Sequence, residues 1–345
     1  RNYMIIQAED ELAAAGMVIG ANWVGARAFT PTSGPGISLM SEFIGFAYYA
    51  EIPSVFINVQ RVGPSTGMPT RTQQSDTMMC AYASHGDTRH PILFPSDPHE
   101  CFDMAVRSFD LAERLQTPVF LLSDLDIGMN DWMVPELDWD DSYRPDRGKV
   151  LRAEDLAEMD RFVRYLDSDG DGIPHRTLPG DDPKGAYFTR GSGHNKYGAY
   201  TEDSDEYQEI LDRLLVKWDT AKTLVPDAVL SSSSKNTKLG VIAYGSSDGA
   251  VIEARDRLAE LGIHVNYLRI RAFPFTSEVH EVLEAHDTIY VVEQNRDAQM
   301  KALLMLEAND IADRLVSILH YNGMPIPSEC VVTGVTRHQG MEVAA

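Results

Sequence analysis

One stretch, residues 7–76, contains three short segments typical of ligand sites: Gln-Ala-Glu-Asp-Glu at 7–11, Thr-Ser-Gly-Pro-Gly at 32–36 and Gln-Arg-Val-Gly-Pro-Ser-Thr-Gly-Met-Pro-Thr-Arg at 60–71. The first opens an Ala- and Gly-rich helix pattern, the second precedes an apolar helix, and the third follows a buried strand pattern. Open α/β sheets build ligand sites from such residues at their strand ends. The residues alone predict either one ligand site or three well-made turns.

Short apolar strands alternate with helices around these segments. The periodicity predicts strands at 3–7, 26–30, 54–59, 91–94 and 118–122, and helices at 9–23, 37–50 and 98–116. Such alternation is typical of parallel strands in a doubly wound sheet. The first part of the chain, residues 1–135, is therefore predicted to be one α/β domain.

The rest of the chain divides into two further parts. Residues 136–235 are acidic and poor in strand patterns, and a helix is expected at 205–220. From residue 236 to 345 the alternation returns, which predicts a second, smaller α/β domain. Its turn Gly245-Ser-Ser-Asp-Gly either presents backbone N–H groups to an anion or is a plain strand-to-helix turn. No G-x-G-x-x-G motif supports dinucleotide binding.

Composition excludes several classes of function. The 345-residue chain has a formal net charge of −22, which argues against binding to nucleic acid or anionic membranes. No apolar run approaches the ~18 residues of a membrane span. The three cysteines form no C-x-x-C pair, so this chain alone is not expected to carry an iron–sulfur cluster or a zinc–cysteine site. Reduced thiols favour the cytoplasm.

Asp167-Ser-Asp-Gly-Asp171 resembles the start of a calcium loop, because carboxylates occupy alternate positions. The twelfth position is Leu178, where a calcium loop needs a bidentate Glu. Either a bound metal or, more favoured by the residues, a tight polar turn accounts for this segment.

Each of the three segments has a functional and a structural interpretation. Glu11 either complements the dipole of the helix that it opens or faces a cofactor ring across a surface kept small by Ala and Gly. Gly34 either permits close approach of a ligand or makes a tight turn. Arg61, just beyond a buried strand, is costly unless a carboxylate from protein or substrate pairs with it.

Taken together, the three segments resemble the α subunit of 2-oxoacid:ferredoxin oxidoreductases, and most closely the 2-oxoglutarate branch. The most specific match is the segment 60–76, which contains Gly-Pro-Ser-Thr-Gly. Weaker matches are Asp171-Gly-Ile-Pro, with Arg176 and Pro179-Gly, and Val-Glu-Gln-Asn at 292–295. The resemblance covers essentially the whole chain, in order.

The resemblance implies a thiamine diphosphate enzyme. Residues 1–135 would form the pyrimidine-binding domain, 136–235 a connecting region and 236–345 a transketolase C-terminal-like domain. Glu11 matches the glutamate that hydrogen-bonds the aminopyrimidine ring, and Thr32, Ser33 and Gly34 would pack on the pyrimidine side. The cofactor supplies a carbon nucleophile and an electron sink.

The resemblance also implies substrate contacts and partners. Arg61 matches the arginine that faces the substrate 1-carboxylate. The loop residues Ser65, Thr66, Thr70 and Arg71 would complete the pocket, with Thr70 or Arg71 near the distal carboxylate of 2-oxoglutarate. A β subunit is expected to carry the diphosphate and Mg²⁺ site and a [4Fe–4S] cluster, to form a dimer of αβ units, and to act with coenzyme A and ferredoxin.

Departures from the family pattern limit these expectations. The chain begins at Arg1 and lacks a Tyr-Pro-Ile-Thr-Pro-Ser-Thr-like loop of the substrate pocket and a γ-type domain, so it is expected to be N-terminally incomplete. Two alternatives stay open at this point. One is a subunit of another thiamine-dependent 2-oxoacid enzyme, pyruvate- or branched-chain-specific, and the other is a non-catalytic scaffold subunit.

Overall fold

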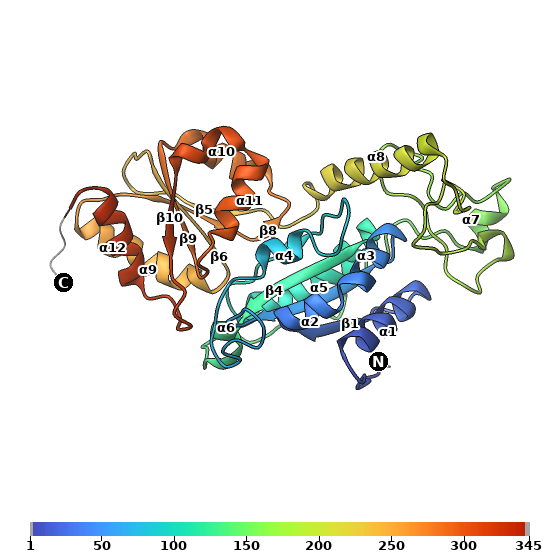
Figure 1. Cartoon of the computed structure of the whole chain (residues 1–345), viewed down its shortest axis with the longest axis horizontal. Helices are drawn as coiled ribbons and strands as arrows, with labels where there is room; N and C mark the ends of the chain where they lie inside the picture. Colours follow the sequence, from blue (N-terminus) through green and yellow to red (C-terminus); the bar gives the residue numbers. More distant parts are fainter. Residues whose placement is uncertain (1–2, 342–345) are drawn as a thin grey trace.

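The computed structural model describes residues 3–341. Figure 1 shows an elongated molecule in which two α/β sheets lie side by side and an irregular segment with α7 and α8 packs at the far end of the first sheet. The prediction of a parallel α/β sheet followed by a second α/β domain is confirmed, and each of the two sheets is parallel except for one edge strand.

The first sheet has five strands. In order across the sheet they are β1 (Phe29–Thr32), β2 (Ser54–Gln60), β4 (Pro118–Asp124), β3 (Ile92–Leu93) and β8 (Ala272–Phe273). The first four are parallel, whereas β8 comes from the C-terminal part of the chain and pairs antiparallel with β3. The helices of this half are α1 (Glu11–Trp23), α2 (Gly34–Leu39), α3 (Ser41–Tyr49), α4 (Thr77–Ala81), α5 (Pro98–Leu115) and α6 (Leu125–Met129).

Local sequence explains where these helices begin. The Asp10 carboxylate caps α1 by accepting from the Ala13 amide at 2.7 Å, and Asp97 caps α5 by accepting from the Glu100 amide at 2.8 Å. Pro98 at the first turn of α5 has no N–H to leave unpaired. The helix predicted at 37–50 is two helices, because the backbone turns at Met40, where ψ is 0°.

The strand predicted at 3–7 was wrong. Residues 3–8 join neither sheet, and Tyr3, Met4 and Ile5 are more than 80% exposed. A β pattern needs a neighbouring strand to satisfy its backbone groups, and none of the described strands pairs with this segment.

The second sheet also has five strands. Their order is β10 (Leu315–Leu319), β9 (Thr288–Glu293), β6 (Leu239–Tyr244), β7 (Asn266–Ile270) and β5 (Val229–Ser231), and only β5 is antiparallel to its neighbour. Its helices are α9 (Asp248–Glu260), α10 (Ser277–Ala285), α11 (Gln299–Glu307) and α12 (Ser328–His338). One hydrophobic cluster continues between the sheets, where Phe94 packs edge-on against Tyr244 with ring centroids 5.0 Å apart.

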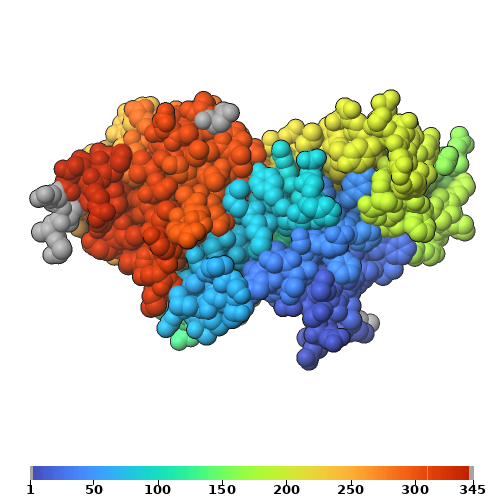
Figure 2. Space-filling view, viewed as in Figure 1, coloured from blue at the N-terminus to red at the C-terminus, as the bar shows by residue number. Residues whose placement is uncertain are grey.

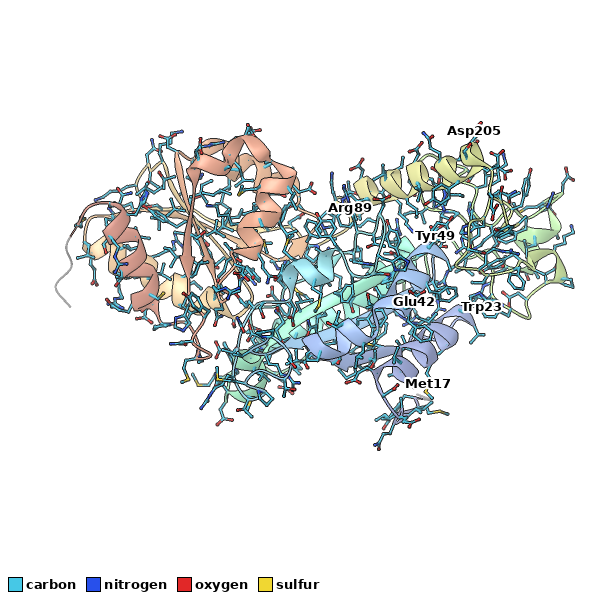
Figure 3. All side chains as sticks on the ribbon, viewed as in Figure 1. Met17, Trp23, Glu42, Tyr49, Arg89 and Asp205 are labelled. Carbon is cyan, nitrogen blue, oxygen red and sulfur yellow. The ribbon has the colours of Figure 1, made fainter. Side chains whose placement is uncertain are left out.

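The acidic middle segment contains α7 (Ala153–Ala157), α8 (Ser204–Ala221) and short turns, and near its end it contributes β5 to the second sheet. Aromatic contacts attach it to the first sheet. The Trp23 indole N–H donates to the Thr189 hydroxyl at 2.6 Å, and the ring centroids of Tyr49 and His194 are 4.6 Å apart. Figure 3 shows Trp23 and Tyr49 on the side of the first half that faces this segment.

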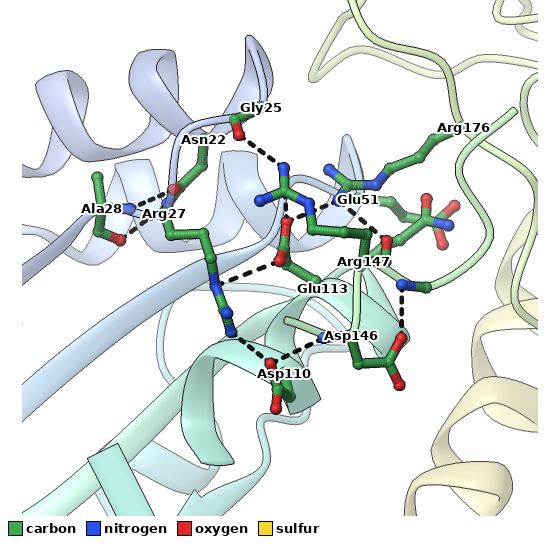
Figure 4. A network of polar contacts seen from close by, with 12 residues as sticks. Asn22, Gly25, Arg27, Ala28, Glu51, Asp110, Glu113, Asp146, Arg147 and Arg176 are labelled. Atoms are coloured by element: carbon green, nitrogen blue, oxygen red, sulfur yellow. Dashed lines mark hydrogen bonds and ion pairs between the residues drawn. The ribbon is translucent and has the colours of Figure 1, made fainter. Parts of the chain in front are cut away.

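Buried carboxylates anchor this segment more firmly. Glu113 on α5 faces three arginines, Arg27 at 3.3 Å, Arg147 at 3.1 Å and Arg176 at 2.9 Å (Figure 4). Glu51, at the end of α3, is ion-paired with Arg213 and, at 2.7 Å, with Lys217 of α8. Burial acts to raise the pKa of Glu51, but the charges of Arg213 and Lys217 outweigh it and hold the pKa below its ordinary value.

Replacing Glu51 is therefore expected to destabilise the fold strongly. In Glu51→Gln, Arg213 and Lys217 stay buried without their counter-charge, which costs about 3–5 kcal/mol of unfolding free energy. Urea denaturation followed by tryptophan fluorescence measures this loss. The matched control is Asp219→Asn, which breaks an exposed pair with Lys222 and should change stability by less than about 0.5 kcal/mol. Equal effects of the two substitutions would contradict the role given to Glu51.

Candidate functional site

The three sequence segments meet at the carboxyl edge of the first sheet. β1 ends at Thr32 beside Asn58 of its parallel neighbour β2, and β2 ends at Gln60, one residue before Arg61. α2 begins at Gly34, two residues beyond the end of β1. Carboxyl ends of parallel strands are where open α/β sheets bind ligands.

Glu11 and Thr32 pack against the same glycine. A Cβ atom built on Gly36 would lie 1.9 Å from Thr32 Oγ1 and 2.9 Å from Glu11 Cγ. Only glycine therefore fits between them as they stand. Glu11 and Thr32 are both half-buried, and their side chains occupy the space that a Cβ on Gly36 would need.

Gly34 provides the second close approach. A Cβ atom there would lie 2.7 and 2.8 Å from the two carboxylate oxygens of Asp76. The preceding residue, Ser33, is the N-cap of α2, yet its hydroxyl makes no capping hydrogen bond.

A cleft of about 870 Å³ opens beside this edge, between the two sheets. One wall comes from the first half of the chain and includes Gly34, Pro35, Ser38, Leu39, residues 61–65, Gln73, Ser75, Asp76 and Met79. The other wall comes from the second half and includes Asn295, Arg296, Asp297, Gln299 and Tyr321.

Arg61 lines this cleft with an unsatisfied donor. Its Nε atom is buried and has no hydrogen-bond partner within residues 3–341. An unsatisfied buried donor costs about 1–3 kcal/mol, and more when it is charged. No hydrogen bond or ion pair engages the Arg61 guanidinium within the described chain, so it is free to pair with an anionic group.

The loop after Arg61 is closed by its own backbone. The Val62 amide donates to Arg71 O at 2.9 Å, and the Met68 amide donates to Val62 O at 3.1 Å. The loop packs on the C-terminal half, since a Cβ on Gly323 would lie 2.7 Å from Met68 Cε; the light blue and red parts meet there in Figure 2. Ser65 lines the cleft, whereas Thr66, Thr70 and Arg71 are exposed and lie outside its lining.

Asp76 is a cleft residue that the sequence predictions did not single out. Its carboxylate accepts from Asn58 Nδ2 at 3.0 Å, and its amide donates to Gln60 Oε1 at 3.0 Å. Burial raises the pKa of Asp76, although the Asn58 hydrogen bond and the Arg61 charge act in the opposite direction. A signal was available, because Asn58 and Gln60 are polar side chains on one face of an otherwise apolar strand, where each must find a partner.

Gln74 fixes the two walls relative to one another. Its amide donates to Gln294 O at 2.8 Å and its Nε2 donates to Tyr244 O at 3.0 Å. Its backbone carbonyl accepts from Asn295 Nδ2 at 3.0 Å. The motif Val-Glu-Gln-Asn at 292–295 therefore joins the domains and places Asn295 in the cleft wall.

The Gly245 turn belongs to the same contact. Ser246 donates to Asp124 Oδ2 at 2.6 Å, and Ser247 donates to Gln74 Oε1 at 3.3 Å. Gly245 has a φ of +58°, and a Cβ there would lie 2.8 Å from Gln74 Nε2. The hydroxyls of this turn serve the domain interface.

The aspartates of the calcium-like segment gather around a lysine. The Lys149 ammonium lies 2.6 Å from Asp169 and 2.7 Å from Asp171, and it also donates to Ile173 O at 2.8 Å. Asp167 accepts from the amides of Gly170 and Gly172, each at 2.9 Å. The geometry is that of a polar turn whose central cation is Lys149.

Comparisons with known proteins identify the family of this chain. The family model described as pyruvate flavodoxin/ferredoxin oxidoreductase, thiamine diphosphate-binding, matches residues 1–165. The α subunit of 2-oxoacid:ferredoxin oxidoreductase 2 from Aeropyrum pernix is 36% identical over 339 residues, covering 96% of this chain and 51% of that protein. The chain thus spans about half the length of the first such relatives.

A shorter relative is covered more completely. The 2-oxoglutarate synthase subunit KorA from Methanothermobacter thermautotrophicus is 34% identical over 296 residues, covering 85% of this chain and 76% of that protein.

Solved structures give the same result. The 2-oxoglutarate:ferredoxin oxidoreductase from Magnetococcus marinus, solved with 2-oxoglutarate, coenzyme A and succinyl-CoA bound, superposes with a TM-score of 0.86 at 27% identity, over 96% of this chain and 56% of that chain. A transketolase from Campylobacter jejuni, at 11% identity and a TM-score of 0.51, shares the fold alone. The searched residues include no helix long and apolar enough to span a bilayer. By sequence and fold, this chain belongs to the family of 2-oxoacid:ferredoxin oxidoreductase α subunits.

Proposed function

We propose that this chain is the α subunit of an enzyme that oxidatively decarboxylates a 2-oxoacid, with coenzyme A as acyl acceptor and ferredoxin as electron acceptor. The observation that carries the proposal is Arg61, whose buried and unsatisfied Nε lies in the cleft at the strand ends. A 2-oxoacid supplies the carboxylate that such a guanidinium lacks.

The residues beside this cleft fit the pyrimidine half of thiamine diphosphate. Gly36 lets Glu11 and Thr32 pack close to one another, and the Ser33 hydroxyl makes no capping hydrogen bond. We assign Glu11 to hold the aminopyrimidine ring and Thr32, Ser33 and Gly34 to pack beside it. When bound, the cofactor supplies the carbon nucleophile and the electron sink for decarboxylation.

We assign the loop from Arg61 to Arg71 to the substrate. Arg61 would bind the 1-carboxylate, and Ser65 and Thr66 would border the pocket. Thr70 or Arg71 would reach the distal carboxylate once the exposed loop moves toward the ligand. Support for 2-oxoglutarate comes from relatives named 2-oxoglutarate synthase and from the Magnetococcus marinus structure, which contains that acid.

The proposed division of labour assigns the remaining groups to a β subunit. Asp76 and Asp297 are the only carboxylates among the residues that line the described cleft, and the chain has three cysteines without a paired motif. We therefore place the diphosphate and Mg²⁺ site and the [4Fe–4S] cluster on that partner, in a cytoplasmic dimer of αβ units. Residues 1–135 would be the pyrimidine-binding domain, 136–235 the connecting region and 236–345 the transketolase C-terminal-like domain.

Removing the Glu11 charge tests the catalytic assignment. Glu11→Gln in the assembled complex should lower 2-oxoglutarate- and coenzyme A-dependent reduction of a viologen dye about 100-fold or more, because a carboxylate that moves a proton contributes at least that much. Glu9→Gln, which neutralises an exposed carboxylate two residues earlier, should leave the rate within twofold. An unchanged rate in Glu11→Gln would favour a scaffold subunit.

Adding a Cβ atom at Gly36 tests cofactor binding separately from turnover. Gly36→Ala should weaken binding of thiamine diphosphate to the assembled complex at least tenfold, since its Cβ would displace Thr32 and Glu11. Titration calorimetry measures the affinity, and thermal denaturation without cofactor verifies the fold. Gly20→Ala on α1, where no atom lies within 4 Å of the new Cβ, is the control and should bind normally. Equal affinities of Gly36→Ala and the wild-type complex for thiamine diphosphate would show that the packing at Gly36 is not part of the cofactor site.

The role of Arg61 should appear in substrate binding. Arg61→Gln is expected to raise KM for 2-oxoglutarate about 10- to 100-fold, the equivalent of one charge-assisted hydrogen bond. Steady-state dye reduction gives KM and kcat, and Arg114→Gln, on the exposed last turn of α5, serves as the control. A normal KM in Arg61→Gln would contradict the assignment.

A further inference from the structure

The fold uses two buried side chains to hold Asp76 in the cleft wall. Asn58 and Gln60, both on β2 and at most 2% exposed, bind its carboxylate and its amide respectively. Gly34 lacks the Cβ that would collide with both carboxylate oxygens. Asn58 Oδ1 is itself buried without a hydrogen-bond partner among the described residues. Such support is more than a helix cap needs, and the carboxylate makes no capping hydrogen bond to α4.

Asp76 acts on Arg61 through its charge and not through contact. Both residues line the same wall of the cleft, and the Arg61 charge acts to lower the pKa of Asp76, yet no ion pair within 4 Å joins them in residues 3–341. Asp76 therefore does not clamp the guanidinium in place. Its field lowers the positive potential that an anion meets near Arg61.

The opposite wall does not cancel this charge. Arg296 and Asp297 pair with one another there, at 2.7 and 3.0 Å, so that their charges largely compensate. On the wall formed by the first half of the chain, Arg61 and Asp76 are the charged residues in the cleft lining. The balance between these two groups sets how strongly the cleft attracts an anion.

We propose that Asp76 is a specificity-determining residue that weakens anion binding at Arg61, and does so more for a dicarboxylate than for a monocarboxylate. The difference follows because Coulomb repulsion grows with the charge of the ligand. This inference rests on the proposed function, since it takes the ligand at Arg61 to be a 2-oxoacid. Asp76 thereby lowers the affinity of the cleft for anions that carry more than one negative charge.

The test replaces Asp76 by Asn in the assembled complex, which keeps the shape of the side chain and its ability to accept from Asn58. KM is measured for 2-oxoglutarate and for 2-oxobutyrate by dye reduction; if one acid is not turned over, its competitive inhibition constant is used. The constant for 2-oxoglutarate should fall at least fivefold and that for 2-oxobutyrate about twofold, with kcat within twofold.

Two further variants separate charge from structure. Asp76→Ser is also neutral and too small to collide with Gly34, so it should shift both constants in the same direction even if the Asn variant folds poorly. Asp103→Asn makes the same charge change on the exposed side of α5 and should leave both constants unchanged.

Unchanged or increased constants in both neutral variants would overturn the inference, as would equal decreases for the two acids. That failure is distinct from failure of the proposed function. If none of the 2-oxoacids supports dye reduction by the wild-type complex, the proposed function itself is wrong and the inference is wrong with it.

Discussion

The buried side chain of Gln74 is the interaction on which the geometry of the cleft depends. Its carboxamide and backbone make hydrogen bonds to Tyr244, Ser247, Gln294 and Asn295, all from the second half of the chain. Each buried hydrogen bond contributes about 0.5–1.5 kcal/mol net, and leaving a partner unpaired costs about 1–3 kcal/mol. The two walls therefore have one favoured relative position. The neighbouring residue Gln73 accepts a hydrogen bond from the Gly63 amide, two residues after Arg61, and so ties the Arg61 loop to this contact.

Two kinds of polar side chain lie around this contact: those that bind other parts of the protein, and those that have no protein partner. Asn58 and Gln60 bind Asp76, and Glu51 and Glu113 form ion pairs that hold elements together. Arg61 Nε and the Ser33 hydroxyl, both at the strand ends, stay free of such bonds within the described chain. That contrast supports our proposal of a binding edge over three tight turns, the alternative that the residues alone left open.

Periodicity predicted most of the helices and strands, because an element that buries one face has apolar residues at a regular spacing along its sequence. It was wrong at 3–7, where strand propensity has no partner strand. It also could not predict that β8, from the second half, completes the first sheet, because such pairing depends on tertiary packing. Ser65, predicted to bind substrate, does line the cleft, whereas Asp76 was missed because its placement depends on Asn58 and Gln60, 16–18 residues earlier.

The central claim is that this chain supplies one half of a thiamine diphosphate site. Titration of the cofactor with Mg²⁺, by calorimetry, into this chain alone and into its complex with the co-purifying partner tests that claim most directly. We predict saturable binding, one cofactor per αβ pair, in the complex and no detectable binding to the isolated chain at the same concentration. Equally tight binding to the isolated chain would contradict the account, because the site would then be complete on one polypeptide.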